Sequence, residues 1–506
     1  MTDTAADTTL LGAFPAASFA KLDALKQLGV CVRCIMRYCG ILDHCLYSLG
    51  SAVLHATWNE FAIAQGGNAS SHEGVCTCCL DVFESALGTS GRDQLLSMSR
   101  ESGYVTSTFM IAIKIPSATL IRQHALSHHV QHQGMSPVDL KEVLKWCLTP
   151  ILAAALNDAT YVATSDISIL LTFAHDVSEQ EAMQLPSIRD TIVQNKKRKL
   201  EIDAFGAVSR ALQALKSALP SSVVVRDLVP RTRSPPPAVA TPSTMMYAME
   251  RAPTYLAGRY LKYQRGLSQT PWVLEGERLG ESSVEEKIGD VVLPHFHAKS
   301  YKFHTAGRED VDVRMLGNGR PFILELLDAK IATLPAEADY KRIEAEVNEK
   351  NLDSVEIQAF RPTNKEQFSA LQAGADSKRK TYCCVVWVAE KLTADRVAIL
   401  NGLKDLQVAQ KTPGIFCIFG PPTIFMYLFK VRVLHRRTLL TRPKIIHDAK
   451  CDVLNDHYML LRLTTSAGTY VKEFVHGDLG RTFPNVSSLL GCDADILQLD
   501  VENLIE

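Results

Sequence analysis

The sequence lacks both a long hydrophobic segment and an excess of charge of either sign. Its longest apolar stretch, Gly414–Phe429, contains two prolines and is shorter than the roughly 20 residues that a membrane-spanning helix needs. The chain has 54 Lys and Arg residues against 55 Asp and Glu residues. These absences exclude a multi-span membrane protein and a histone-like polycation. A local basic groove for nucleic acid is compatible with a neutral total.

The N-terminus also lacks the basic start of a secretory or mitochondrial signal. We therefore expect the protein in the nucleus, the cytoplasm or both. Thiols stay reduced in these compartments, so the 13 cysteines are expected to be metal ligands or ordinary core residues rather than disulfides.

The first half of the chain is expected to contain two packed regions. Seven cysteines lie before residue 80 and mark a small N-terminal unit over residues 1–95. Residues 96–225 combine a helix pattern at Ser136–Cys147 with a strand pattern at Ser165–Phe173, which predicts an α+β domain.

The second half is expected to be one further domain behind a linker. Prolines crowd the stretch Pro230–Pro242, where regular packing is not possible, so we predict a linker over residues 226–246. Residues 247–506 then alternate strand patterns with helical and basic segments.

Two Cys-x-x-C pairs, Cys31 with Cys34 and Cys76 with Cys79, suit one tetrahedral metal site. Each pair offers two thiolates from a tight turn, and four thiolates form the usual structural zinc site. We predict zinc held for folding by these four residues. The alternative is a set of buried, reduced cysteines.

Two other polar clusters are interpreted as solvent-exposed helix surfaces. The segment around His124, His128, His129 and His132 has no carboxylate or cysteine that completes a metal site. The basic run Asn195–Leu200 is interpreted as a solvated helix face, with a nuclear import signal or an RNA contact as the alternative.

The stretch Gly307–Arg314 is the most informative short segment. Its residues Asp310, Asp312 and Arg314 alternate with two valines, so on a strand the charged side chains would share one face while the valines enter the core. The pattern predicts a functional site, or the solvated face of an edge strand.

A second such stretch, Ala467–Phe474, follows the strand pattern Tyr458–Thr465. Tyr470 and Lys472 are two residues apart and would face the same way on an extended chain. An aromatic ring beside an ammonium group suits a flipped base and a catalytic carboxylate. The alternative is the end of a surface strand.

These motifs resemble those of pseudouridine synthases. Arg308-Glu-Asp310 resembles their arginine-x-aspartate signature, and Gly468-Thr-Tyr-Val-Lys472 resembles their Gly-Thr-Tyr-x-Arg/Lys motif. Longer stretches are similar to the archaeal and eukaryotic tRNA pseudouridine synthase family called pseudouridylate synthase ten. These stretches are Gly258–Trp272, Gly307–Phe322, Val431–Pro443 and Gly468–Thr482.

The resemblance covers essentially all of residues 246–506 and implies an α+β protein. A zinc-bearing, THUMP-like α/β region would precede a catalytic domain with a mixed, largely antiparallel sheet flanked by helices. The family isomerises uridine to pseudouridine in the T-arm of tRNA, at position 55, position 54 or both, without an organic cofactor. We therefore expect tRNA as the partner of a monomer, with no DNA and no membrane.

The resemblance also implies roles for individual residues. Asp310 would be the nucleophile that detaches uracil from C1′, with Asp312 as its rival. Lys472 would pair with Asp310 and favour the ionised carboxylate. The remaining substrate contacts implied are Arg308, Tyr382 and Tyr470, where Tyr470 packs on the target base and Tyr382 has a plain core tyrosine as its alternative.

Two basic segments suit contacts with RNA phosphates. Arg259, Lys262 and Arg265 recur at helical spacing, and a second run contains Arg436 and Arg437. The family's pattern departs at Gly414–Lys430, which is inserted before the second run.

Two other function classes stay open at this point. One is a tRNA-binding scaffold that keeps the fold without the chemistry. The other is a metal-dependent phosphodiesterase using Asp310 and Asp312, for which the sequence offers no clear further ligands.

Overall fold

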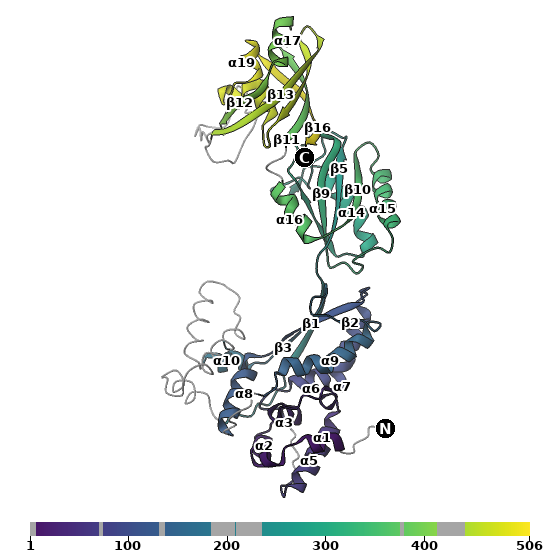
Figure 1. Cartoon of the computed structure of the whole chain (residues 1–506), viewed down its shortest axis with the longest axis vertical. Helices are drawn as coiled ribbons and strands as arrows, with labels where there is room; N and C mark the ends of the chain where they lie inside the picture. The colour runs from purple at the N-terminus through teal and green to yellow at the C-terminus, as the bar shows by residue number, and fades with distance from the viewer. Residues whose placement is uncertain are drawn as a thin grey trace. The chain divides into compact units, whose positions relative to one another are not determined.

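The computed structural model describes residues 7–69, 74–130, 137–183, 208, 235–374, 379–411 and 441–505. Within these ranges every helix is too short or too polar to cross a membrane. The predicted basic run Asn195–Leu200 and the insertion Gly414–Lys430 lie outside the described residues. The chain divides into two compact units, Met1–Ala252 and Pro253–Glu506 (Figure 1).

The first unit begins with helices. Asp7 caps the first of them by accepting a hydrogen bond from the backbone N–H of Leu10, which satisfies a free donor of the first turn. The helices are α1 (Thr8–Ala13), α2 (Phe19–Gln27), α3 (Val32–Cys39), α4 (His44–Tyr47), α5 (Ser51–Ala64), α6 (Val82–Leu87) and α7 (Thr89–Glu101), with the 3₁₀ turn η1 (Ala16–Ser18).

A four-stranded sheet in the order β2-β1-β3-β4 follows. The first three strands pair in parallel, and the last pairs antiparallel with β3. The elements are β1 (Thr108–Lys114), β2 (Thr160–Tyr161), β3 (Ile167–Ala174) and β4 (Thr244–Arg251), with α8 (Ser117–His129), α9 (Leu140–Ala155) and α10 (Val177–Met183). The predicted helix in Ser136–Cys147 and strand in Ser165–Phe173 are therefore present as α9 and β3.

The predicted domain boundaries differ from those of the structure in two places. One hydrophobic core runs from Leu10 to Phe173, so residues 1–95 share their core with the sheet that follows instead of packing alone. The catalytic domain was expected from residue 247, but the second unit begins at Pro253. The reason is that β4 completes the sheet of the first unit by pairing with β3.

The second unit is built on a ten-stranded sheet in the order β10-β5-β9-β16-β11-β14-β13-β12-β15, with β8 paired to β9. Among the described strands of this sheet only β9 and β16 pair in parallel, so the sheet is mixed and largely antiparallel, as predicted. The strands are β5 (Thr254–Lys262), β8 (Ser300–Thr305), β9 (Arg314–Leu327), β10 (Val355–Thr363), β11 (Arg379–Val388), β12 (Lys404–Lys411), β13 (Thr441–Asn455), β14 (Tyr458–Thr465), β15 (Thr482–Phe483) and β16 (Ala494–Ile505).

Helices flank this sheet and bury its apolar side chains in a second core. They are α14 (Val284–Val292), α15 (Glu337–Lys350), α16 (Lys365–Gly374), α17 (Ala394–Asn401), α18 (Val471–His476) and α19 (Val486–Leu490), with the 3₁₀ turns η2 (Leu293–Phe296) and η3 (Gly477–Gly480). The predicted strand Tyr458–Thr465 is β14.

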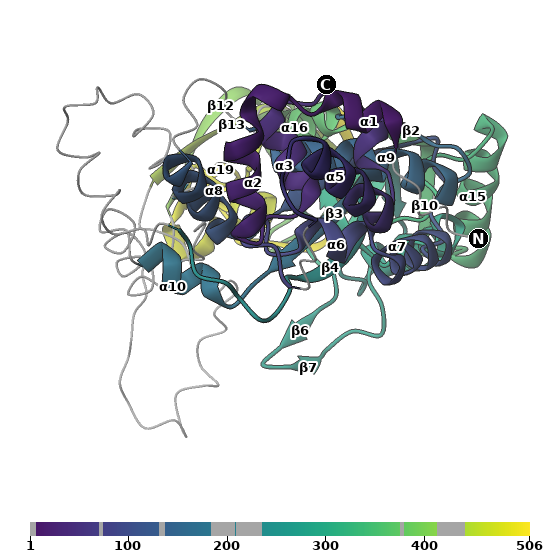
Figure 2. The same ribbon diagram turned by 90° about the horizontal axis from the view of Figure 1, so that it is seen from below.

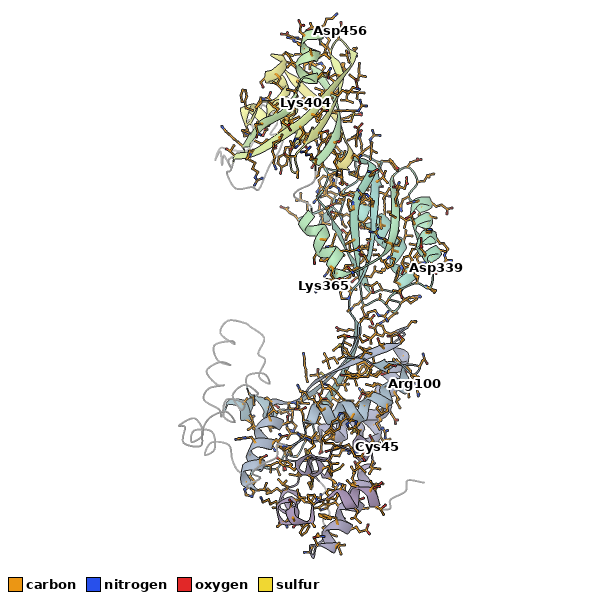
Figure 3. All side chains as sticks on the ribbon, viewed as in Figure 1. Cys45, Arg100, Asp339, Lys365, Lys404 and Asp456 are labelled. Atoms are coloured by element: carbon orange, nitrogen blue, oxygen red, sulfur yellow. The ribbon has the colours of Figure 1, made fainter. Side chains whose placement is uncertain are left out.

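Two local features of this unit lie at its surface. Lys404 on β12, labelled in Figure 3, forms an ion pair with Asp448, its register partner on β13. The hairpin of β6 (Val273–Leu274) and β7 (Glu277–Arg278) projects from the rest of its unit (Figure 2). Its turn residues Glu275 and Gly276 both have positive φ, as a tight two-residue hairpin turn requires.

Candidate active site and four-cysteine cluster

The loop between β8 and β9 meets the first turn of α18 at one lysine. Lys472 Nζ lies 2.8 and 2.9 Å from the two carboxylate oxygens of Asp312, and 3.1 Å from Oδ2 of Asp310. Burial lowers the pKa of Lys472, but the two carboxylates outweigh burial and raise the pKa above its ordinary value. Lys472 is therefore positively charged at neutral pH, between two acids.

The Asp310 side chain is 71% exposed, whereas that of Lys472 is only 28% exposed. An incoming molecule can therefore reach Asp310 while its cationic neighbour stays largely covered. This combination of an accessible carboxylate and a held ammonium is what a nucleophilic or acid–base reaction requires.

The backbone around these residues differs from the prediction. Residues 306–313 form a loop rather than a strand, and β9 begins only at Arg314. Tyr470 is the N-cap of α18 and Lys472 lies inside that helix, so the two do not share an extended chain. The aspartates reach the same ammonium because the loop turns, not because a strand alternates.

Lys262 and Arg265, expected to contact phosphate, instead hold this loop. Lys262 is completely buried on strand β5, and its Nζ donates to the carbonyl oxygens of Leu267, Asp310 and Val311 at 2.8, 3.1 and 3.2 Å. Arg265 donates to the carbonyl of Asp312 at 2.8 Å. The predicted RNA contact of Lys262 is therefore wrong, because a buried ammonium saturated by carbonyls cannot reach phosphate.

The other predicted basic contacts have different outcomes. Arg259 and Lys262 both lie on strand β5, so their helical spacing does not reflect a helix. Arg259 donates to the carbonyls of Asn318 and Gly319. Arg436 and Arg437 lie outside the described residues. Their role in RNA binding stays a prediction.

The predicted substrate contacts Arg308 and Tyr382 both lie near the site. Arg308 is exposed in the same loop as Asp310. Tyr382 lies on β11, partly buried against the core of the second unit, and its contact with substrate stays a prediction. Burial raises the pKa of Tyr382 to about 12, Arg320 opposes this shift, and the nearby charge of Asp310 adds to it.

Gln410 was missed by the sequence analysis, yet it places the start of α18. Its buried side-chain amide donates to the carbonyl of Tyr470 and accepts from the N–H of the same residue, both at 3.0 Å. The amide thereby binds both backbone groups of the residue two positions before Lys472. No local pattern marks such a role, because Gln410 lies 60 residues away on β12.

Asp500 on β16 joins the end of the loop to the centre of the sheet. It accepts from Arg314 Nη2 and from Arg265 Nη2, each at 2.6 Å. Burial raises the pKa of Asp500, but the hydrogen bonds and charges of the two arginines outweigh burial and lower the pKa below its ordinary 3.8. Asp500 is thus an ionised anchor for two cations.

We expect Asp500→Asn to lower the free energy of unfolding by about 2 kcal/mol at pH 7, because it removes the charged acceptor that Arg265 and Arg314 share. A lowered folded-state pKa stabilises the protein fully above the unfolded-state value, and this contribution is lost as pH falls through the folded-state pKa. The difference from wild type should therefore shrink as the pH is lowered below about 4. Urea unfolding at several pH values measures this, and an equal difference at pH 3 and pH 7 would contradict it.

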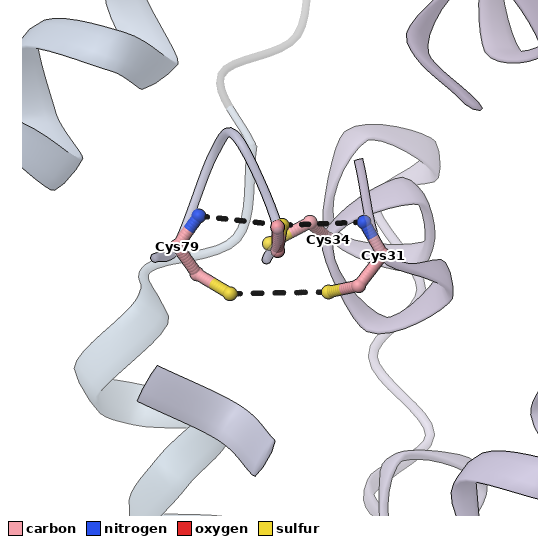
Figure 4. A group of neighbouring side chains, drawn as sticks. Cys31, Cys34 and Cys79 are labelled. Atoms are coloured by element: carbon pink, nitrogen blue, oxygen red, sulfur yellow. Dashed lines mark hydrogen bonds between the residues drawn. The ribbon is translucent and has the colours of Figure 1, made fainter. Parts of the chain in front are cut away.

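The four predicted cysteines gather in the first unit (Figure 4). The sulfurs of Cys31, Cys34, Cys76 and Cys79 all lie within 4.8 Å of one another, and those of Cys31 and Cys79 are 3.9 Å apart. Two thiolates bound tetrahedrally to zinc at about 2.3 Å lie about 3.8 Å apart. Among the described residues this is the one group with metal-ligand geometry, and Cys78 does not belong to it.

Two buried basic residues lie beside this cluster; burial lowers the pKa of one of them, Lys26, and the charges of Cys31 and Cys76 oppose that shift. Lys26 is 1% exposed, and its Nζ has no hydrogen-bond partner within the described part of the chain. Arg37 is equally buried and donates to Cys34 Sγ at 3.7 Å. Four thiolates around a divalent ion carry a net charge of −2, so two positive side chains would balance it. The donor set and these cations fit a tetrathiolate metal site.

Comparison with known proteins agrees with this architecture. The family model described as "Pus10, C-terminal" matches residues 255–504, and "Eukaryotic Pus10, N-terminal" matches residues 76–225. The mouse protein named "tRNA pseudouridine synthase Pus10" is 33% identical over 85% of this chain and 78% of its own length. The human protein of the same name is 30% identical over 95% of this chain and 96% of its own length.

A solved structure titled "Crystal Structure of a Cbf5-Nop10-Gar1 Complex" aligns with 49% of this chain and 48% of its own, at a TM-score of 0.25 and 11% identity. The assignment rests on the family models and the sequence relatives instead. They define a pseudouridine synthase, an isomerase. More specifically, the chain belongs to the Pus10 family.

Proposed function

We propose that this protein isomerises uridine to pseudouridine in the T-arm of tRNA, with Asp310 as the nucleophile. The observation that carries the proposal is the exposed carboxylate of Asp310, 3.1 Å from the Lys472 ammonium, in a loop between two strands of the central sheet. The printed names of the mouse and human relatives support tRNA as the substrate class.

Each residue of the site has a separate role in the proposed reaction. A target uridine must leave its stack before the loop can reach its sugar. The Asp310 carboxylate then forms a bond to C1′ as the bond from C1′ to N1 of uracil breaks. The base turns, and C5 bonds to C1′ as the bond from Asp310 to C1′ breaks, which frees the carboxylate. C5 then loses its proton and N1 gains one. Lys472 offsets the negative charge of Asp310 and Asp312 throughout, and Tyr470 at the start of α18 packs on the base.

The four cysteines are proposed to hold Zn²⁺ for folding. A filled tetrahedral thiolate shell leaves no open position for a substrate, so the ion would stabilise the fold of the first unit. The region around it would bind RNA in a THUMP-like manner, and the protein would act as a monomer. The reaction itself needs no organic cofactor.

The test is to incubate the purified protein with an unmodified tRNA transcript and to map pseudouridine by carbodiimide labelling and primer extension. We expect one or two stops in the T-arm. Binding of the tRNA without any stop would instead support a scaffold without chemistry. Chelator-sensitive cleavage of the tRNA would support the phosphodiesterase alternative.

Lys472 provides a further prediction. Lys472→Met leaves two carboxylates facing each other without a cation, and we expect pseudouridine formation to slow by about 100-fold. Lys472→Arg keeps the charge and should retain most of the rate. Single-turnover rates on the same transcript measure both variants, and equal rates for Met and Arg would show that the charge is not needed.

A further inference from the structure

Glu309, the middle residue of the Arg-x-Asp motif, points the opposite way from its neighbours. Arg308 and Asp310 are exposed, whereas the Glu309 side chain is only 1% exposed. It forms an ion pair with Arg320 of β9, whose side chain is equally buried, with Nε at 2.8 Å from Oε2. Burying this charge pair beside the proposed nucleophile has a high desolvation cost. We therefore ask what function the pair serves at this position.

The carboxylate of Glu309 accepts from a second buried donor besides Arg320. Tyr260 on β5 donates its hydroxyl to Glu309 at 2.8 Å, and Gln269 in turn donates to the Tyr260 oxygen at 2.7 Å. Tyr260, Gln269 and Arg320 are all buried. Burial and the charge of Glu309 raise the pKa of Tyr260, so its hydroxyl stays protonated and donates.

The same partners also bind the backbone of the loop. Arg320 Nη1 donates to the carbonyl of Ala306 at 2.8 Å, and Gln269 Nε2 donates to that of Gly307 at 3.1 Å. Gly307 has φ +92°, and a Cβ there would lie 2.9 Å from Arg320 Nη1, so the guanidinium occupies the space of a side chain. The network therefore holds residues 306, 307 and 309, directly before Asp310.

We infer that Glu309, through Arg320 and Tyr260, is a positioning residue that sets where Asp310 stands relative to Lys472. This rests on the proposed role of Asp310. Lys262 and Arg265 hold the carbonyls of residues 310–312 on the other side, so Glu309 is the anchor that fixes the entry of the loop. A displacement of about 1 Å at a reacting group costs on the order of 100-fold in rate.

The decisive variant is the double substitution Glu309→Gln with Arg320→Met. The single change Glu309→Gln leaves a buried, unpaired guanidinium and can fail through instability alone. The double variant removes both charges and restores a neutral core, but Met offers no donor to the Ala306 carbonyl. We expect a melting temperature close to that of wild type, tRNA affinity within about twofold, and kcat lower by about 100-fold.

Three controls make the result decisive. Asn351→Ala removes a buried polar bridge between the carbonyl of Val347 on α15 and that of Lys287 on α14, and it should lower stability without changing kcat of the folded protein. Tyr260→Phe removes one donor and should lower kcat by about 5-fold. Hydrogen exchange of peptides covering 306–313 should be faster in the double variant and unchanged in Asn351→Ala.

The inference is overturned if the double variant recovers kcat together with stability, since Glu309 would then serve the fold alone. A rise in KM at constant kcat would also overturn it, because that result assigns Glu309 to binding. Asp310→Asn in the wild-type background separates the two proposals. If that variant stays active, the nucleophile assignment fails whatever Glu309 does.

Discussion

Replacing Asp310 with Asn is expected to abolish pseudouridine formation, with a loss of more than about 1,000-fold in single-turnover rate. An amide keeps the size of the side chain but cannot form the bond to C1′ on which the proposed reaction depends. The fold should be preserved, because the Asp310 side chain is largely exposed and the loop is held through backbone carbonyls. The melting temperature should therefore stay within a few degrees of wild type.

Asp312→Asn is the matched control. Asp312 lies in the same loop and binds the same ammonium with both of its oxygens, so the change alters the hold on Lys472 and leaves Asp310 intact. We expect a loss of about 10-fold and an unchanged site of modification. Primer extension on carbodiimide-treated transcript measures both variants. If Asp312→Asn is the inactive variant and Asp310→Asn is active, the nucleophile is Asp312.

Replacing Cys34 with Ser is expected to unfold most of the first unit. Structural zinc sites contribute on the order of 10 kcal/mol to folding, and a hydroxyl is a poor replacement for a thiolate ligand. The four cysteines lie in the same core as the sheet of that unit, so the loss should extend beyond the two turns. Circular dichroism melting and metal content by mass spectrometry measure the effect.

Cys78→Ser is the matched control for this prediction. Cys78 is 1% exposed and lies in the same turn, but its sulfur is outside the four-cysteine group. We expect one bound zinc and a stability loss of only about 1–2 kcal/mol from burying a hydroxyl. Equal metal loss in both variants would show that the ligand assignment is wrong, and full metal content in Cys34→Ser would show the same.

Much of the site could be predicted because its signals are local. The spacing of Cys31, Cys34, Cys76 and Cys79 indicates a tetrahedral site from two tight turns, and the structure brings their sulfurs together. The pairing of Lys472 with Asp310 follows from two motifs whose resemblance to a family is specific. The strand Tyr458–Thr465 carries a regular alternation and is present as β14.

Other predictions failed where the outcome depended on distant parts of the chain. Gly307–Arg314 alternates like a strand, yet the carbonyls of residues 307, 310 and 312 accept from the side chains of Gln269, Lys262 and Arg265 instead of from a neighbouring strand. Lys262 is a residue type that often contacts phosphate. On β5, however, its side chain is completely buried. The charge of a lysine does not by itself indicate whether its ammonium group binds an RNA phosphate or a backbone carbonyl oxygen.

The sequence by itself determined the family, the group of four cysteines and the two motifs that carry Asp310 and Lys472, because each motif is encoded by residue types at short, fixed spacing. Only the tertiary structure decided how the acid is held. Glu309 lies in the loop before β9 and pairs with Arg320 on that strand. Gln410 binds the backbone of Tyr470, which lies 60 residues further along the chain. Whether a polar side chain faces water or a buried partner depends on which strands pair, and that is set by packing of the whole sheet.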